Sequence, residues 1–246
     1  MRTQMEPLGA VVAVIPCLDE EAAIGQVVAA VRAHVDQVIV VDGGSRDRTA
    51  ERAEAAGARV IAEPRRGYGR AVQAGIRALP DGCAVVLFLD GDGSDPAERI
   101  PEVLAPIRAG RADFVLGSRI RGEREPGSLT APQLVAGRLG FVLLRLVYGA
   151  RFTDLSPFRA IRREALDRLG MREETYGWNL AMLMRVAAAG LRAEEVPVGQ
   201  RRRAGGVSKV SGDLRASLAA AWSIAATFLR LALALRRARP VQDASA

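Results

Sequence analysis

The sequence predicts an α/β fold in which helices flank a mostly parallel central sheet. First, short apolar stretches alternate with helical stretches over residues 10–120, with short connections between them. Second, Val85 to Leu89 are five consecutive apolar residues, which is typical of a strand buried on both faces. Third, that strand ends in carboxylates separated by glycines, at the position where parallel sheets bind ligands.

The elements follow one another regularly in the first half of the chain. The strands are predicted over residues 11–16, 37–41, 59–62, 85–89 and 113–117. The helices between them are predicted over about 20–31, 49–56, 70–79 and 96–109. A chain of 246 residues with 49% apolar composition can bury one substantial core, with or without an appended element.

After Arg119 the alternation becomes irregular. Residues 121–132 are rich in Gly, Pro and charge and are predicted to form a mobile loop that could act as a lid. Beyond it we expect an apolar helix over 133–147 and a short strand entered at 154–159. Two helices should start near 163 and 176, followed by a strand over 191–197. A basic loop over 201–209 and a long helix over 211–237 complete the chain. We therefore expect a main domain over 1–210 and an amphipathic helix with a short tail over 211–246.

Charge is distributed unevenly. The chain carries a net charge of +7, and residues 1–120 contribute −3 whereas residues 121–246 contribute +10. This basic half suggests an anionic partner: a membrane surface, a phosphate-bearing substrate or nucleic acid. With 4% aromatic residues and no recognisable nucleic-acid-binding motif, nucleic acid is disfavoured. Two cysteines beside apolar strands and the lack of a signal segment favour a reducing, cytoplasmic compartment.

The last predicted helix is apolar on several faces. Residues 217–235 carry one charge, Arg230, and many are alanine, so the segment is a poor membrane span. A helix lying in the membrane interface fits better, with Arg236, Arg237 and Arg239 facing anionic head groups. If the helix binds the membrane in this way, we expect the protein at the inner, cytoplasmic face. Packing of this helix on the core or on a partner subunit of a homo-oligomer is an equal alternative.

Asp90 and Asp92 are the candidate metal ligands. Two hard carboxylate donors at a strand end suit Mg²⁺ or Mn²⁺, whose remaining ligands are then water and substrate phosphates. A solvated acidic turn is the competing interpretation. An EF-hand is excluded, because the sixth position from Asp90 is Asp95 and the twelfth is Pro101. Asp95 followed by Pro96 fits a helix N-cap.

Further candidates lie at other strand ends and in the basic loop. Asp42 ends a buried strand, where a carboxylate can either bind a nucleoside or cap a turn. A Rossmann dehydrogenase is disfavoured, because the first strand runs into residues 16–20 without a glycine-rich phosphate turn. The nearest match to such a turn, Gly67-Tyr68-Gly69, lacks the third glycine. Lys209 is the one lysine among 35 basic residues, and its flexible ammonium suits a point contact with phosphate.

In combination these segments resemble the family-2 glycosyltransferases of the GT-A fold, specifically the dolichyl- or polyprenyl-phosphate sugar synthases. The resemblance runs from about Val11 to Gly212. The segments that carry it are 14–21, the Asp42–Asp47 turn, Leu89–Asp92, Gly117–Arg119, Ser156–Arg159 and Arg203 with Ser208 and Lys209. Leu18, Asp19 and Ala181 depart from the family pattern, in which an aromatic residue, Asn and Glu are usual.

The resemblance implies a metal-dependent, inverting transfer of a sugar from a UDP- or GDP-sugar to a polyprenyl phosphate. The implied nucleotide-binding residues are Pro16, Leu18, Glu20, Asp42, Gly69 and Asp90. The implied acceptor-phosphate residues are Ser156, Arg159, Arg203, Ser208 and Lys209. Asp92 and Arg119 are the implied catalytic residues. Asp154 is the candidate base if the acceptor is a hydroxyl, since a phosphate acceptor needs none. A soluble transferase to a hydroxyl and a non-catalytic nucleotide-sugar or lipid-surface binding protein are the alternatives.

Overall fold

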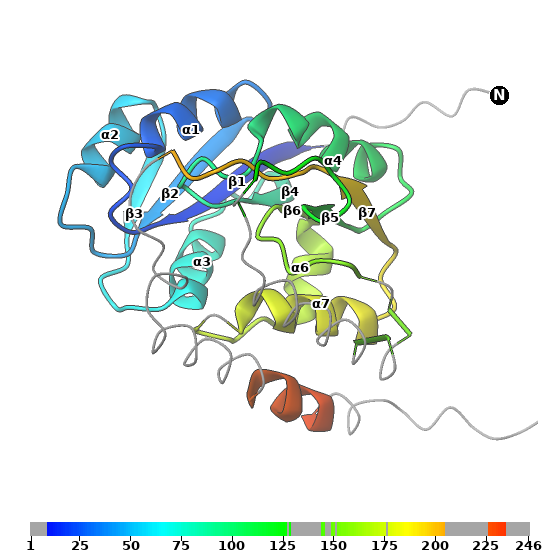
Figure 1. The fold of residues 1–246 in the computed structure, drawn as a ribbon. Helices are drawn as coiled ribbons and strands as arrows, with labels where there is room; N and C mark the ends of the chain where they lie inside the picture. The colour runs from blue at the N-terminus through cyan, green and yellow to red at the C-terminus, as the bar shows by residue number, and fades with distance from the viewer. Residues whose placement is uncertain are drawn as a thin grey trace, which may run out of the picture.

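The fold is known from a computed structural model, which describes residues 9–126, 128, 144–145, 149–150, 152–175, 177–204 and 226–234. Within these residues the core is one seven-stranded sheet with helices on both faces (Figure 1). The order of the strands across the sheet is β3 (Arg59–Ala62), β2 (Gln37–Asp42), β1 (Ala10–Cys17), β4 (Cys83–Phe88), β6 (Arg159–Arg162), β5 (Phe114–Ser118) and β7 (Ala193–Pro197). The predicted α/β class with a mostly parallel sheet is confirmed.

One strand runs against the others. β6 is antiparallel to both β4 and β5, whereas every other pairing in the sheet is parallel. The chain therefore enters β6 at the edge of the sheet where β4 and β5 end, and Phe88 of β4 lies opposite Arg159 of β6. As a result, residues 152–158 approach the carboxyl ends of the parallel strands.

The helices form a layer on each face. The upper layer in Figure 1 contains α1 (Ile24–Arg32), α2 (Thr49–Ala55) and α4 (Ile100–Arg108), which follows the short 3₁₀ turn Ala97–Arg99. The lower layer contains α3 (Tyr68–Arg77), α6 (Arg163–Leu169) and α7 (Trp178–Ala188). Alternate residues of β1 enter the two apolar clusters, Val12 and Val14 on one side and Ala13 and Ile15 on the other. The sheet is thus covered on both faces, as parallel sheets normally are.

The apolar stretch 85–89, most of which lies in β4, is at the centre of this core. Val85, Val86 and Leu87 have no exposed surface, and Phe88 and Leu89 are 1% exposed. Each such large apolar side chain contributes about 1.5–3 kcal/mol on burial. The prediction of a strand buried on both faces is confirmed.

Most predicted boundaries shift by one or two residues, and two of the predicted helices differ more from the observed elements. α1 begins at Ile24 instead of Glu20, because residues 20–23 form a turn in which the Ala23 and Ile24 amides donate to the Glu20 carbonyl. The predicted helix over 96–109 is divided into the 3₁₀ turn and α4. The predicted helix over 133–147 lies outside the described residues except for Leu144 and Arg145, and the proposed domain boundary at 210 also lies outside them.

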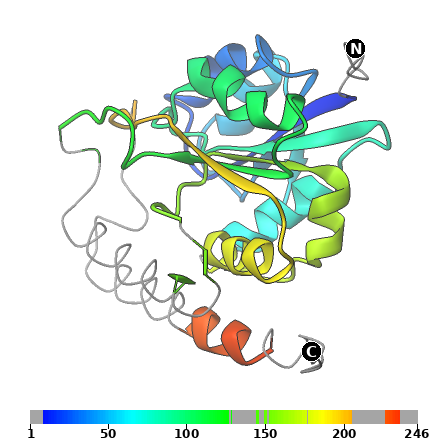
Figure 2. The same ribbon diagram turned by 90° about the vertical axis from the view of Figure 1, so that its right-hand side faces the viewer.

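Residues 226–234 form a helix that lies against α7 in both views (Figures 1 and 2). Thr227 and Leu231 are buried on its inner side, and a Cβ at Gly177 would collide with Thr227. Leu229 and Leu233 point outward, with 64% and 61% exposed. Among the described helices none combines the length and apolar character needed to cross a bilayer.

A buried ion pair fixes the segment before α7. The Glu173 carboxylate accepts a hydrogen bond of 2.9 Å from Arg185 Nη2. Burial alone would raise the pKa of Glu173, but the hydrogen bond from Arg185 lowers it below its usual value. Its contribution is therefore present above the unfolded-state pKa of about 4.3 and is lost as the pH falls through the lower folded-state pKa.

We expect Glu173→Gln to lower the free energy of unfolding at pH 7 by about 3 kcal/mol, because it leaves a half-buried guanidinium without its counter-ion. The difference from the wild type should shrink as the pH falls below about 4. Urea denaturation at several pH values measures this. Glu174→Gln is the matched control, since its ion pair with Arg70 is largely exposed and should contribute at most about 1 kcal/mol. Equal costs for the two variants would contradict the assignment.

Candidate active site at the carboxyl edge of the sheet

The candidate site lies where the parallel strands end. β1 is flanked by β2 on one side and by β4 on the other, so a crevice is expected beyond its carboxyl end. Cys17 of β1 pairs in register with Asp42 of β2, and Asp90 follows directly after β4 and Leu89. The structure therefore brings the loops after β1, β2 and β4 to one edge, as the sequence predicted.

The acidic turn after β4 is held by its own side chains. Asp95 Oδ2 accepts the Asp90 amide at 2.9 Å, and Asp92 Oδ1 accepts the Ser94 amide at 2.8 Å. Gly93 permits the turn with a φ of +77°. Asp95 thus closes the turn through the Asp90 amide, and the hydrogen bond that would cap the following helix is not seen.

Three carboxylates are crowded into this turn. Burial raises the pKa of Asp90 well above its usual value, and repulsion from Asp92 and Asp95 raises it further. Burial likewise raises the pKa of Asp95 to about 7. The Asp95 Oδ1 atom is buried without a hydrogen-bond partner. A site of this kind has an excess of negative charge that a cation would relieve.

The donor set fits a divalent cation that is bound together with its substrate. Within the described residues no group of three or more His, Cys, Asp or Glu side chains forms a complete metal cluster. Asp90 and Asp92 are the residues that would hold the ion, and water and substrate phosphates would complete its shell, as is usual for Mg²⁺. Two carboxylate donors with an orphaned buried oxygen beside them suit Mg²⁺ or Mn²⁺.

Gly91 has a steric role in the turn. A Cβ added there would collide with the Sγ atom of the buried Cys17. We expect Gly91→Ala to lower the free energy of unfolding by about 1–3 kcal/mol, the usual cost of overpacking. In a Cys17→Ala background the same substitution should cost distinctly less, because the colliding sulfur is gone. Urea denaturation of the four proteins measures the coupling, and equal costs in both backgrounds would rule out the collision.

The loops after β1 and β2 are linked to each other. Ser45 donates its amide and hydroxyl to the Asp42 carboxylate, and its hydroxyl oxygen accepts the Asp19 amide. Thr49 Oγ1 accepts the Glu20 amide at 2.8 Å. Asp42 therefore caps the turn, as in one of its two predicted roles. Pro16 and Leu18 lie beside these groups and are partly exposed at the same edge.

Arg119 follows β5 and forms a bidentate ion pair with Asp154. Its Nε and Nη2 atoms donate to the Asp154 carboxylate at 2.8 and 2.6 Å, and its backbone amide donates at 2.8 Å. The Leu155 amide donates to the same carboxylate. Burial would lower the pKa of Arg119, but Asp154 raises it, and Asp95 and Asp90 add to the increase. Arg119 is thus an obligate cation facing the acidic turn.

This geometry corrects the expectation that Asp154 is a general base. Asp154 is 2% exposed, and both of its carboxylate oxygens accept hydrogen bonds from Arg119 or Leu155. A base must reach the proton that it removes, and a carboxylate enclosed in this way does not. Asp154 instead orients Arg119.

The segment 201–204 lies over the acidic turn. The Arg201 amide donates to the Ser94 carbonyl, and the Ala204 amide donates to the Asp92 carbonyl. The Arg203 guanidinium bridges Glu20 at 2.5 Å and Asp92 Oδ2 at 2.7 Å. The structure thus brings Arg203 to the predicted site, whereas Ser208 and Lys209 lie outside the described residues.

Arg159 and Ser156 do not face the crevice, contrary to their predicted role in acceptor binding. Arg159 has no exposed surface and donates to the carbonyls of Asn179, Pro157 and Ser156. Burial lowers its pKa to about 10. Ser156 is also fully buried, and its hydroxyl accepts the Phe158 amide. These side chains hold the entry to β6 instead of contacting a ligand.

Gly69 likewise packs inward. A Cβ at Gly69 would collide with the Glu173 carbonyl, and the Arg70 amide at the start of α3 donates to the Glu174 carbonyl. The backbone of residues 173–174 therefore occupies the position where a phosphate would approach this helix N-terminus. The structure does not support Gly69 as a nucleotide contact.

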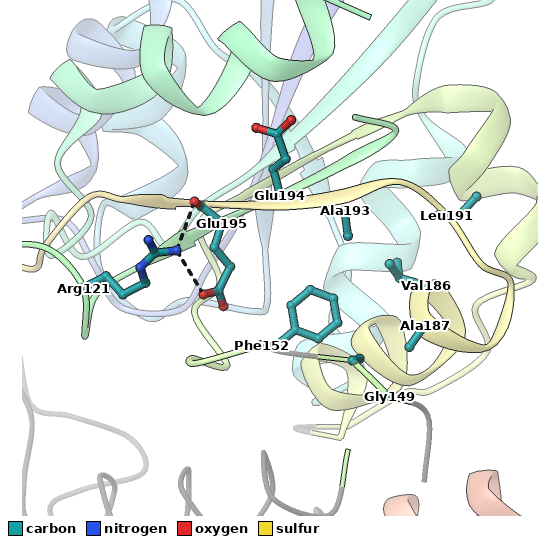
Figure 3. Close-up of a pocket in the computed structure, with 10 residues that line it drawn as sticks. Arg121, Gly149, Phe152, Val186, Ala187, Leu191, Ala193, Glu194 and Glu195 are labelled. Carbon is teal, nitrogen blue, oxygen red and sulfur yellow. Dashed lines mark hydrogen bonds and ion pairs between the residues drawn. The ribbon is translucent and has the colours of Figure 1, made fainter. Parts of the chain in front are cut away.

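A cavity of about 350 Å³ lies apart from the acidic turn, between β7 and the end of α7 (Figure 3). Phe152, Val186 and Leu191 give it apolar walls, and Arg121 and Glu195 pair at 3.7 Å on its rim. Glu195 also accepts the amide and hydroxyl of Thr153, which anchors the segment that carries Asp154. None of the residues that line this cavity belongs to the acidic turn.

Comparison with known proteins decides the family. Residues 12–170 match the family described as glycosyl transferase family 2. The chain belongs to that family. An uncharacterised glycosyltransferase of Mycobacterium tuberculosis is 41% identical over 86% of this chain and 94% of its own length. The dolichyl-phosphate hexose transferase of Haloferax volcanii is 40% identical over 76% of this chain and 81% of its own.

Solved structures of the GT-A fold agree with this family assignment. Glucosyl-3-phosphoglycerate synthase from Mycobacterium tuberculosis, in complex with Mn²⁺, UDP-glucose and phosphoglyceric acid, superposes with a TM-score of 0.74. The identity is 25%, and the match covers 91% of this chain and 80% of that one. The undecaprenyl-phosphate mannosyltransferase of Micrococcus luteus is 32% identical over 72% of this chain and 76% of its own. This family 2 protein is therefore a glycosyltransferase with the GT-A fold.

Three interactions that hold the site together were not predicted from the sequence. Asp95 closes the acidic turn, Glu20 pairs with Arg203, and Glu195 anchors Thr153. The first could have been recognised, because a third carboxylate within one short acidic turn is a local feature. The other two join residues 183 and 42 positions apart, and no local pattern indicates them.

Proposed function

We propose that this glycosyltransferase moves a sugar from a nucleoside-diphosphate sugar to a polyprenyl phosphate, with inversion at the anomeric carbon. The observation that carries the proposal is the Arg119–Asp154 pair beside the acidic turn. In this pair Arg119 is a fixed cation that can bind phosphate. Asp154 is engaged by Arg119, so it is not available as the base that a hydroxyl acceptor would need. The names of the relatives from Haloferax volcanii and Micrococcus luteus support a lipid-phosphate acceptor.

In the proposed reaction an acceptor phosphate oxygen attacks the anomeric carbon and forms the new bond. The bond from that carbon to the donor diphosphate breaks, and the diphosphate leaves with the electron pair. An acceptor phosphate is already ionised at neutral pH, so no proton has to be removed. A divalent cation held by Asp90 and Asp92 supplies charge neutralisation for the leaving diphosphate when it is bound.

The residues of the chain supply orientation and further positive charge. The Asp154 carboxylate accepts hydrogen bonds from Nε and Nη2 of Arg119. The Nη1 group can therefore donate to a phosphate oxygen. Arg203 provides a second guanidinium above the turn. Ser208 and Lys209 follow it in sequence and remain proposed acceptor-phosphate contacts. Pro16, Leu18 and Asp42 remain the proposed nucleoside contacts at the ends of β1 and β2.

We further propose that the protein associates with the membrane at its cytoplasmic face. The outward residues Leu229 and Leu233, with exposed Arg230 between them, form an apolar and basic surface on helix 226–234. Such a surface suits the interface of an anionic membrane. Flotation with anionic vesicles tests it, and Leu229→Ser with Leu233→Ser should reduce the bound fraction.

Two measurements test the activity. Thermal-shift screening of UDP- and GDP-sugars with and without Mn²⁺ identifies the donor, because a ligand of the native state raises its melting temperature. Incubation of that labelled donor with polyprenyl phosphate should then give an organic-extractable product. A water-soluble product with a small hydroxyl acceptor, as the name of glucosyl-3-phosphoglycerate synthase suggests for that enzyme, would replace the lipid assignment. If the protein binds the donor but transfers the sugar to no acceptor, the alternative of a non-catalytic nucleotide-sugar-binding protein would be favoured.

A further inference from the structure

Arg203 is paired with the carboxylate that the proposed cation also requires. Its Nη1 lies 2.7 Å from Asp92 Oδ2, while Asp92 Oδ1 accepts the Ser94 amide. A divalent cation on Asp92 would therefore meet a guanidinium already bound to the available oxygen. Two cations at one carboxylate repel each other, so the binding of the ion and this pairing of Arg203 oppose one another.

Arg203 is incompletely satisfied in this position. Its Nε–H is buried and has no hydrogen-bond partner, which costs free energy. Its Nη2 lies 2.5 Å from Glu20, in the loop after β1. Glu20 is therefore placed to retain the guanidinium at the crevice after its contact with Asp92 breaks, when Nη1 and Nε can turn toward a phosphate.

We propose that Arg203 serves as an internal counter-ion of Asp92 that the divalent cation and donor diphosphate displace, and that Glu20 then retains it beside the transferred phosphates. This inference rests on the proposed metal-dependent function and adds an order of events to it. The cation and donor bind first; Arg203 then leaves Asp92 and contacts the phosphates. Glu20 is a positioning residue in this scheme, because it acts through Arg203.

Titration of the purified protein with Mn²⁺ alone, followed by electron paramagnetic resonance of the unbound ion, tests the competition directly. Arg203→Gln should bind Mn²⁺ about threefold or more tightly than the wild type, because the competing cation is gone. Its turnover should fall at the same time, because the phosphates lose a guanidinium. Arg201→Gln is the matched control. It removes the same charge from the same segment, but its partner is the exposed Glu98.

The comparison separates direct competition from general electrostatics. An Arg203→Gln protein whose Mn²⁺ affinity is no higher than that of Arg201→Gln would overturn the inference. Glu20→Gln should leave the affinity for Mn²⁺ close to that of the wild type while turnover falls, and unchanged turnover would remove Glu20 from the scheme. If the wild type and Asp92→Asn bind Mn²⁺ equally weakly, the metal site of the proposed function fails instead.

Discussion

Asp90→Asn should lower turnover by about 100- to 1,000-fold while it raises the melting temperature of the metal-free protein. The loss follows because the variant lacks one of two carboxylates that would hold the cation, and a single electrostatic group of this kind contributes about that factor. The gain follows because desolvation raises the pKa of Asp90 well above its usual value, and repulsion from Asp92 and Asp95 raises it further. A carboxyl whose folded-state pKa is raised destabilises the fold as the pH rises above its unfolded-state pKa of about 3.9, and the full penalty is present above the folded-state pKa.

Differential scanning fluorimetry and a donor-turnover assay measure the two effects. A stabilisation of about 1 kcal/mol corresponds to a rise of about 2–4 °C in a domain of this size. Asp113→Asn is the matched control. Asp113 pairs with Arg192 at 2.7 Å away from the acidic turn, and hydrogen bonds from Arg192 lower its pKa. This control should lose a little stability and keep its turnover. Retention of turnover by Asp90→Asn in Mn²⁺ would refute the metal assignment.

The framework of the site was predictable because its signals are local. Five consecutive apolar residues indicated β4, and the change to Asp90-Gly91-Asp92 marked the point where it ends. The carboxyl ends of parallel strands share one edge, so placing Asp42 and Asp90 near each other required only the fold class. The structure confirms this part of the prediction.

The order of the strands and the direction of β6 were less accessible. An antiparallel strand in an otherwise parallel sheet depends on how the chain returns after residues 121–152, where the alternating pattern is lost. That return also decides which side chains of 154–159 face the crevice. Arg159 was interpreted as a phosphate ligand because it is a cation in a matching motif. Its apolar neighbours Phe158, Ala160 and Ile161 were the sequence signal that it could be buried.

The ion pairs of the site were not predictable for a different reason. Arg119 and Asp154 are 35 positions apart and Glu20 and Arg203 are 183 apart, and in a chain with 34 arginines each acid has many candidate partners. Charge composition limits the number of pairs that can form but not their identity. The tertiary fold selects them, and with them it decides which carboxylates remain available for chemistry.

Asp154→Asn should lower the free energy of unfolding by about 3 kcal/mol and turnover by about 100-fold. The stability loss is that of breaking a buried ion pair from one side, because Arg119 is 17% exposed and would retain its charge without a counter-ion. The loss of turnover would follow from misplacement of the Arg119 guanidinium by about 1 Å or more, with no loss of a proton acceptor. Urea denaturation and steady-state kinetics measure the two effects.

The pattern of kinetics distinguishes an orienting carboxylate from a base. If Asp154 orients Arg119, then Arg119→Gln should cost a similar factor, and the double variant should be little worse than either single variant, because both disrupt one unit. The shape of the pH–rate profile should also survive in Asp154→Asn. A base would instead give a profile whose acidic limb disappears in Asp154→Asn alone, with additive losses in the double variant. Glu194→Gln, which breaks the exposed pair with Arg111, controls for the loss of an ordinary surface carboxylate and should change stability by at most about 1 kcal/mol.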